Sequence, residues 1–265
     1  MRLLDKPEVF LVAYPTVDWT EIRRYLRAVD TDALEWADRV QESGLSDGES
    51  LVEFGGRLCY RSWVEGLNPN VRRVRKDSTD YLGNILESHH GSVIEHANYS
   101  FVMHNVSRVF THELVRHRAG AAYSQESMRF VRLDDLPFWM PEWARDDPDL
   151  MGRSIDLLHQ MERHQRWMAE HFGLDDPGVP FSEKKAKTSF MRRFAPDGVA
   201  TGVLCTMNIR TLRHVIYMRT ALGAEEEIRL VFDEVAYICA EKFPDLMQDY
   251  SPDEDRAWIP EWIKV

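Results

Sequence analysis

Short β-like runs that alternate with segments of helical spacing constrain the fold of this chain most strongly. The β-like runs are Val9 to Tyr14, Tyr99 to His104 and Val199 to Met207. The helical segments that follow them are Asp18 to Val40, Val106 to Arg116 and a helix capped by Asn208 that runs to about Met218. Short apolar or alternating runs favour strands, and apolar residues three or four positions apart favour helices. The sequence therefore predicts a mixed α/β (α+β) fold and, because no repeat or clear boundary interrupts it, one domain over residues 1–265.

The remaining segments predict three more helices and one irregular stretch. Helices are expected at Tyr81 to Glu87, at Ile155 to His171, and from the acidic Glu225-Glu226-Glu227 to just before Pro244. The apolar stripe of the last helix is Ile228, Val231, Phe232, Val235 and Ile238. A short element is expected from Arg57 to Trp63, bounded by Gly55-Gly56 and Gly66. Leu133 to Pro148, with its three prolines, is expected to be irregular, within an insert at about 133–180.

Charge is unevenly distributed along this acidic chain. A net charge of −11 argues against a nucleic-acid polymer or an anionic membrane as partner. Two basic segments, 108–132 and 184–219, together carry +10, so the remaining residues carry −21. A small anionic ligand fits this distribution better than a polymer. Because no window approaches about 18 apolar residues and the cysteines form no CxxC pair, we expect no membrane insertion and a cytoplasmic location.

A cluster of arginine and serine residues in the first basic segment suits a bound phosphate. Arg116-His117-Arg118 is followed six residues later by the run Ser124-Gln125-Glu126-Ser127-Met128-Arg129-Phe130. A guanidinium pairs with two phosphate oxygens at once, and serine hydroxyls complete the shell. The alternative is a solvated helix face with ordinary surface arginines, which is the weaker interpretation of so dense a cluster.

Other chemistries are disfavoured by the sequence. Six histidines lie between His89 and His117, but a helix would separate His112 from His117 by about 140°, so we expect no metal site. No Walker-type phosphate loop and no GxGxxG or GxSxG motif occurs. The three cysteines lie in apolar segments, so we expect buried structural thiols rather than nucleophiles at Cys59, Cys205 and Cys239.

The second basic segment carries charged residues on two faces of one expected helix. Arg210 and His214 are four residues apart and share a face. Arg219 lies five residues beyond His214 and points about 140° away if the helix is unbroken. Either the helix ends before Arg219 or its two faces serve different parts of a site. An ordinary basic surface helix is the alternative.

Four ordered segments together resemble the flavin-dependent thymidylate synthases. The first is the Arg-His-Arg signature with the serine and arginine loop that follows it. The other three are Gly56 to Tyr60, which resembles the family's Arg-x-Cys-aromatic segment, His90 to His96, which resembles its His-x-Ser/Thr-x-x-Glu-His segment, and Asn208 to Arg219, which resembles its Asn-x-Arg helix. The likeness extends through most of the chain, except for residues 1–50 and 133–180.

The resemblance implies a central sheet flanked by helices, a homotetramer with FAD at subunit interfaces, and reductive methylation of a uridine monophosphate at C5. Methylenetetrahydrofolate would supply the carbon and NADPH the electrons. The cofactor set, implied to hold FAD, comprises Ser92, Glu95, Arg116, His117, Arg118, Asn208, Arg210 and His214. The substrate set, implied to surround the nucleotide, comprises Glu113, Arg116, Gln125, Glu126, Ser127, Met128, Arg129, Arg192 and Arg219. His90 is implied to lie on the folate or nicotinamide side of the flavin.

Arg219 is the expected catalytic residue. When C5 of uracil attacks an electrophilic carbon, negative charge moves toward N3 and O4 of the ring. A guanidinium stays protonated in a protein, so it would stabilise this charge electrostatically rather than act as a base. No covalent cysteine adduct is then required.

Two departures from the family pattern bear on the sugar of the substrate. Ala119-Gly120-Ala121-Ala122 puts eight residues between Arg-His-Arg and Ser127, where the family usually has seven, and Phe130 stands where the family has tyrosine. We expect these small residues to leave room for a ribose 2′-hydroxyl, as in the side branch of UMP C5-methylases of polyoxin-like nucleoside-antibiotic pathways. The substrate is therefore expected to be dUMP, UMP or both. The alternative from another class is a non-catalytic flavin- or nucleotide-binding regulatory module.

Overall fold

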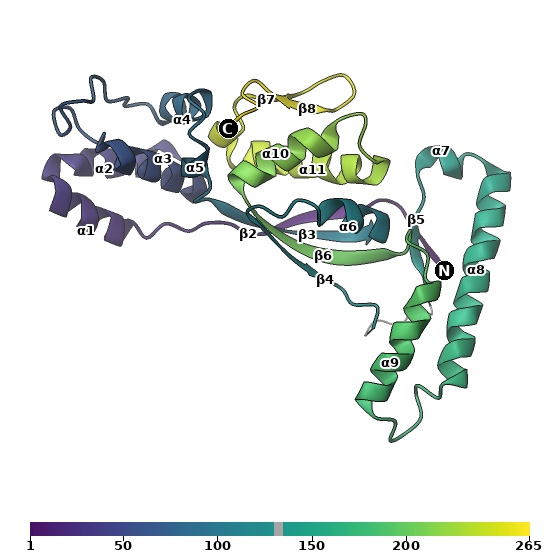
Figure 1. Ribbon diagram of the computed structural model, residues 1–265. Coiled ribbons are helices and arrows are strands. Elements are labelled where there is room, and N and C mark those ends of the chain that lie inside the picture. The colour runs from purple at the N-terminus through teal and green to yellow at the C-terminus, as the bar shows by residue number, and fades with distance from the viewer. Residues whose placement is uncertain (130–134) are drawn as a thin grey trace. The chain divides into compact units, whose positions relative to one another are not determined.

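A computed structural model of the protein describes residues 1–129 and 135–265 (Figure 1). The strands are β1 (Arg2–Leu4), β2 (Glu8–Ala13), β3 (Asn98–Ser107), β4 (Ala121–Gln125), β5 (Pro137–Trp139), β6 (Ala200–Asn208), β7 (Tyr250–Pro252) and β8 (Trp258–Pro260). The α-helices are α1 (Trp19–Val29), α2 (Leu34–Ser43), α3 (Asp47–Tyr60), α4 (Ser78–Glu87), α5 (Gly91–Ile94), α6 (Arg108–Leu114), α7 (Glu142–Arg145), α8 (Pro148–His171), α9 (Phe181–Met191), α10 (Ile209–Thr220) and α11 (Glu226–Lys242). Short 3-10 helices are η1 (Thr31–Ala33), η2 (Arg192–Phe194) and η3 (Pro244–Leu246). The predicted mixed α/β class is confirmed.

Within the described residues, β2, β3, β6 and β4 pair in that order into one sheet. Residues Tyr99, Phe101 and Met103 of β3 are buried while the side chains between them are not, which is the alternation expected of a strand with one covered face. Two smaller sheets pair β1 in parallel with β5 and β7 antiparallel with β8. None of the described helices is long and apolar enough to cross a bilayer.

The chain divides into two compact units, each assembled from three separate segments. Unit 1 comprises Met1–Phe10, Val102–Arg116 and Tyr123–Cys205. Unit 2 comprises Leu11–Phe101, His117–Ala122 and Thr206–Val265. The chain passes between the units within each of β2, β3, β4 and β6, and once more after α6. That all 265 residues form one domain stays a prediction.

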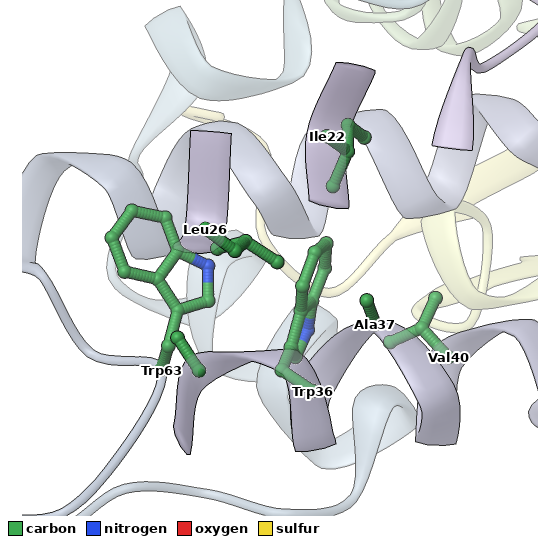
Figure 2. Close-up of a cluster of buried hydrophobic side chains, with 7 residues drawn as sticks. Ile22, Leu26, Trp36, Ala37, Val40 and Trp63 are labelled. Carbon is green, nitrogen blue, oxygen red and sulfur yellow. The ribbon is translucent and has the colours of Figure 1, made fainter. Parts of the chain in front are cut away.

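An apolar cluster between α1, α2 and the segment after α3 forms part of the core of unit 2 (Figure 2). Its buried members are Ile22, Leu26, Ala33, Trp36, Ala37, Val40 and Trp63. Leu26 and Trp36 are wholly buried, and each buried side chain of this size stabilises the fold by about 1.5–3 kcal/mol. The indole Nε1 of Trp36 donates to Glu53 Oε1 (2.7 Å), so its polar atom is also satisfied.

The predicted helix from Asp18 to Val40 is interrupted at Asp30. This residue has extended backbone angles and ends α1, and its carboxylate then accepts a hydrogen bond from the Asp32 N–H (2.9 Å) to begin η1. An aspartate side chain competes well for backbone N–H groups, and for that reason it caps helices more often than it continues them.

Helix α3 continues through Gly55-Gly56, so the predicted boundary there is wrong. A Cβ atom at Gly56 would lie 2.7 Å from the hydroxyl oxygen of Tyr81 in α4. The glycine therefore allows close packing of α3 against α4 instead of ending the helix. The short element predicted from Arg57 to Trp63 begins as the last turn of α3.

The segment predicted to be irregular belongs to unit 1. The described part of Leu133 to Pro148 includes β5 and α7, which corrects that prediction, while residues 130–134 lie outside the described structure. Helix α8 is confirmed but starts at Pro148, where the Asp147 carboxylate accepts from the Leu150 N–H (3.0 Å). Helix α9 was not expected from the sequence. Its buried contact is with α8, through a small core of Met168, Leu174 and Met191.

Helices α10 and α11 pack against each other in unit 2 and begin as predicted (Figure 1). The Asn208 side chain caps α10 by accepting from the Thr211 N–H (2.9 Å). Glu225 caps α11 by accepting from the N–H groups of Glu227 and Ile228. The predicted stripe of α11 is buried from Ile228 to Val235, and Ile238 is half-buried.

Candidate functional site

A cavity of about 510 Å³ in unit 1 holds much of the predicted substrate set. Its lining residues are Arg108, Gln125, Glu126, Ser127, Met128, Ser189, Arg192 and Arg193. They come from the start of α6, the end of β4 and the loop after it, the last turn of α9, and η2. Three of the eight are arginines and one is acidic, so the electrostatic field in the cavity favours an anion.

Glu126 fixes the loop that carries Ser127, one of the two serines in the cavity lining. Its backbone N–H donates to the Gly202 carbonyl (3.0 Å), and its carboxylate accepts from the Gly202 N–H (3.0 Å) and the Thr201 hydroxyl (3.4 Å). The side chain therefore extends the pairing of β4 with β6 by one residue. Glu126 lines the cavity with its carboxylate bonded to β6, and its contact with the nucleotide stays a prediction.

The neighbouring side chains are also held by specific contacts. The Ser127 hydroxyl accepts from the Arg129 N–H (3.4 Å), and the Thr188 hydroxyl of α9 donates to the Arg129 carbonyl (3.0 Å). The Gln125 amide donates to the Thr111 hydroxyl of α6 (3.4 Å). A contact from α6 thus holds the end of β4, and a contact from α9 holds the loop that follows it at Arg129.

Some predicted substrate residues lie elsewhere. Glu113 belongs to α6 and Arg116 follows it, and neither lines the cavity; Arg129 adjoins the lining loop without being part of the lining. Arg219 belongs to unit 2. Phe130 lies outside the described residues.

Sequence reasoning missed three lining residues, Arg108, Ser189 and Arg193. Arg193 directly follows the predicted Arg192, so their adjacency was the available signal. Ser189 could not be found because α9 itself was not recognised.

His117 joins two residues of α10 within unit 2. Arg219 Nε donates to His117 Nε2 (2.7 Å), and the His117 ring lies edge-on to the His214 ring, with 6.3 Å between centroids. Helix α10 runs unbroken to Thr220, so the possibility that it ends before Arg219 is wrong. Because Nε2 accepts this hydrogen bond, the His117 ring orients the Arg219 guanidinium.

Arg210 brings α5 and α10 together in the same unit. Its Nη1 pairs with Glu95 Oε1 (2.7 Å), and its Nε donates to the Val265 carbonyl (3.2 Å). A Cβ atom at Gly91 would lie 2.6 Å from Arg210 Nε, so the backbone at the start of α5 lies directly against the guanidinium. The predicted cofactor residues Glu95 and Arg210 are thus in contact.

The small-residue segment before β4 is anchored to the first turn of α10. The Asn208 N–H donates to the Gly120 carbonyl (3.1 Å), and the Thr211 hydroxyl donates to the Ala119 carbonyl (2.7 Å). Gly120 has a φ of +64°, and a Cβ atom there would lie 2.2 Å from the Asn208 amide nitrogen. Gly120 itself therefore leaves no open space, in contrast to the room expected along this segment.

The cofactor set, apart from Arg116, lies within unit 2. Its hydrogen-bond donors are the exposed or half-buried side chains of Ser92, His117, Arg118, Asn208, Arg210 and His214. Guanidinium, hydroxyl and amide donors suit the oxygens of a pyrophosphate, and α10 begins among them, where its macrodipole favours an anion. The residues present in unit 2 therefore fit a flavin dinucleotide.

The cysteines differ from one another in exposure. Cys205 and Cys239 are buried as predicted, and burial raises the pKa of the Cys205 thiol to about 12. Cys59 is exposed, which corrects the expectation that all three are buried. None of the three lines the unit 1 cavity.

Comparisons with known proteins give a consistent result. The family described as Thymidylate synthase complementing protein matches residues 42–245. A flavin-dependent thymidylate synthase of Mycobacteroides abscessus is 33% identical over 268 residues, covering 100% of this chain and 93% of the relative. Crystal structures of a UMP/dUMP methylase from Streptomyces cacaoi share the fold at 18% and 16% identity, with TM-scores of 0.54 and 0.58. They cover 93% of this chain and 95% and 94% of theirs, and they were solved with 5-Br dUMP and 5-Br UMP bound.

Proposed function

Because this chain belongs to the flavin-dependent thymidylate synthase family, we propose that it methylates a uridine monophosphate reductively at C5. The substrate is dUMP, UMP or both, methylenetetrahydrofolate donates the carbon and NADPH donates the electrons. The observation that carries the proposal is the arginine-rich cavity of unit 1, whose lining includes five predicted substrate residues.

The unit 1 cavity is suited to the phosphate end of a nucleotide. Its volume of about 510 Å³ lies within the usual range for small-molecule sites, roughly 300–1,000 Å³. Arg108, Arg192 and Arg193 supply positive charge, and the Ser127 hydroxyl supplies a further donor. A phosphate monoester carries close to two negative charges at neutral pH, so it matches this lining better than a neutral nucleoside would.

Arg219 is proposed to stabilise the negative charge that develops on N3 and O4 of uracil. Its hydrogen bond to His117 (2.7 Å) restricts the guanidinium to one orientation, so less reorganisation is needed as the charge forms. The cofactor set is proposed to bind FAD through its phosphate oxygens. A bound flavin would supply the reducing electrons, which no amino-acid side chain can deliver. His90 is proposed to lie on the folate or nicotinamide side of that cofactor.

The active assembly is proposed to be a cytoplasmic homotetramer with FAD at subunit interfaces. Family membership supports this state, and the free cysteines of the described chain are compatible with a reducing compartment.

The first experiment measures flavin content and product together. Purified protein should be yellow and should convert dUMP, UMP or both when NADPH and methylenetetrahydrofolate are present. Arg192→Gln should raise the KM for the nucleotide, while the matched Arg153→Gln on the exposed face of α8 should not. A colourless protein that takes up no added FAD, or a yellow protein that methylates neither nucleotide, would contradict the proposal.

A parallel assay of dUMP and UMP tests the sugar. If the loop admits a 2′-hydroxyl, the two nucleotides should be methylated with comparable kcat/KM. If UMP neither binds nor reacts, the expectation of a UMP methylase is wrong, and dUMP is the substrate.

A further inference from the structure

A second, smaller cavity lies in unit 2, and His90 is the one residue that it shares with the predicted site residues described above. It has a volume of about 190 Å³, and its lining residues are Tyr60, Ser62, Val71, Arg73, Arg75, Tyr81, Asn84, Ile85 and His90. At about 30 Å³ per water molecule, the cavity has room for roughly six waters. This space admits one aromatic ring but not a whole dinucleotide or folate. Any larger ligand would therefore enter with one end only.

One wall of this cavity offers a stacking surface. The rings of Tyr60 and His90 are stacked, with 5.9 Å between centroids and an interplanar angle of 29°. Tyr60 is 47% exposed, so a large part of its ring remains available to a ligand. Offset stacking on such a ring favours a planar aromatic group.

The permanently charged side chains in the lining of this cavity are all positive. Arg73 and Arg75 are its permanently charged residues, and no described residue in the lining is acidic. Burial raises the pKa of Tyr81 to about 12, so its phenol stays neutral and adds no opposing charge. An anionic group is therefore attracted to this cavity, and no carboxylate in the lining competes for the guanidiniums.

The backbone that carries these arginines is fixed from the core. Arg57 is wholly buried, and its Nη2 donates to the Arg75 carbonyl (2.8 Å), while its guanidinium lies 4.2 Å from the centroid of the Tyr81 ring. The Arg75 side chain is not used in this contact. That side chain lines the cavity, and it extends from a backbone that Arg57 holds in place.

We propose that this cavity binds the anionic arm of a co-substrate, with an aromatic ring stacked on Tyr60 and carboxylate or phosphate oxygens paired with Arg73 and Arg75. This inference rests on the proposed function, which requires two co-substrates of this chemistry. The aminobenzoyl-glutamate end of a reduced folate and the adenosine 2′-phosphate end of NADPH both combine a planar ring with an anion. The two probes used in the test distinguish these two sources.

The test measures binding to the FAD-loaded protein by titration calorimetry. The probes are 5-formyltetrahydrofolate for the folate arm and adenosine 2′,5′-bisphosphate for the nicotinamide dinucleotide arm. The variants are Arg73→Gln/Arg75→Gln and Tyr60→Leu. The matched control is Arg72→Gln, which removes an exposed charge from the same loop but does not alter the lining.

We expect the double variant to bind one of the probes about tenfold more weakly and with less dependence on NaCl concentration, and Tyr60→Leu to weaken the same probe. Arg72→Gln should stay within about twofold of the wild type. The KM of the matching co-substrate should rise with little change in kcat, because the contact is uniform binding remote from the reacting carbon. The probe that binds the double variant more weakly identifies which co-substrate the cavity binds.

Unchanged affinity for both probes in the double variant would overturn the inference, as would a wild-type protein that binds neither probe. If the wild type methylates a uridylate while the double variant keeps both co-substrate KM values, the inference fails and the proposed function stands. If probe binding depends on Arg73 and Arg75 but no uridylate is methylated, the proposed function fails instead.

Discussion

Replacing Arg57 with methionine should destabilise the protein more than any surface charge replacement. Its guanidinium donates to Glu53 Oε1 (2.7 Å), to the Ser62 carbonyl (2.7 Å) and to the Arg75 carbonyl (2.8 Å), and both charged side chains are 0% exposed. Methionine fills a similar volume but leaves the Glu53 carboxylate and two carbonyls without these donors. Breaking a buried pair from one side costs about 3–5 kcal/mol, a large share of a typical folding free energy of about 5–15 kcal/mol.

The measurement is urea unfolding followed by the fluorescence of the eight tryptophans, which include Trp36, whose indole also bonds to Glu53. With a typical slope of about 1–3 kcal/mol per M, a loss of ~4 kcal/mol lowers the midpoint by about 2 M. Removing both charges, as Glu53→Gln/Arg57→Met, should recover part of this loss because no carboxylate is then buried alone. The exposed pair of Arg24 with Glu21 (2.8 Å) is the matched control, and Arg24→Met should cost less than about 1 kcal/mol. Equal losses from Arg57→Met and Arg24→Met would refute the reasoning.

Three other outcomes follow from the structure. Arg219→Gln should lower kcat about 100- to 1,000-fold without loss of bound flavin, and full turnover in that variant would remove Arg219 from the mechanism. At pH 9 a thiol reagent should label the exposed Cys59 rapidly and leave Cys205 unreacted, since a pKa of about 12 leaves roughly one thiolate in a thousand; equal labelling rates would contradict this burial effect. Gly120→Ala should lower the melting temperature more than Gly66→Ala, because both sites have positive φ but only the Gly120 substituent meets Asn208, and equal shifts would disprove the close contact.

The sequence predicted well those elements whose local signals agree with their packing. Asn208 and Glu225 begin helices because their side chains satisfy free N–H groups, a local effect that needs no tertiary information. The last of these helices also carries a clear apolar stripe. In contrast, α9 has many lysines and little periodicity, and it is a helix in contact with α8. Its existence depends on a partner that the sequence does not reveal.

The glycine pair in α3 and the buried Arg57 show a second limit. Gly55-Gly56 has the local character of a break, but the close approach of Tyr81 makes the small residue favourable inside the helix. Arg57 was noted as the start of a short element and as part of a family segment, but not as a buried residue. Its burial depends on Glu53 one turn earlier and on carbonyls of residues that follow. Both outcomes are set by tertiary neighbours.

For the candidate site, the loop after β4 and Arg192 were predicted to share a ligand, and they line one cavity. The role of Glu126 was not predictable, because its partner Gly202 lies 76 positions away and nothing in a glycine marks it as a hydrogen-bond donor to a carboxylate. The hydrogen bond of His117 to Arg219 spans 102 positions and is equally invisible to local reasoning.

Because the chain passes repeatedly between the two units, recombination and truncation can change this protein in few ways. Each unit draws on three stretches of sequence, and the last passage falls inside β6. A single genetic crossover therefore cannot exchange one unit for a foreign copy, and no terminal truncation yields either unit intact. An insertion between β5 and α9, in contrast, would fall outside β2, β3, β6 and β4 and would not interrupt the pairing of these strands.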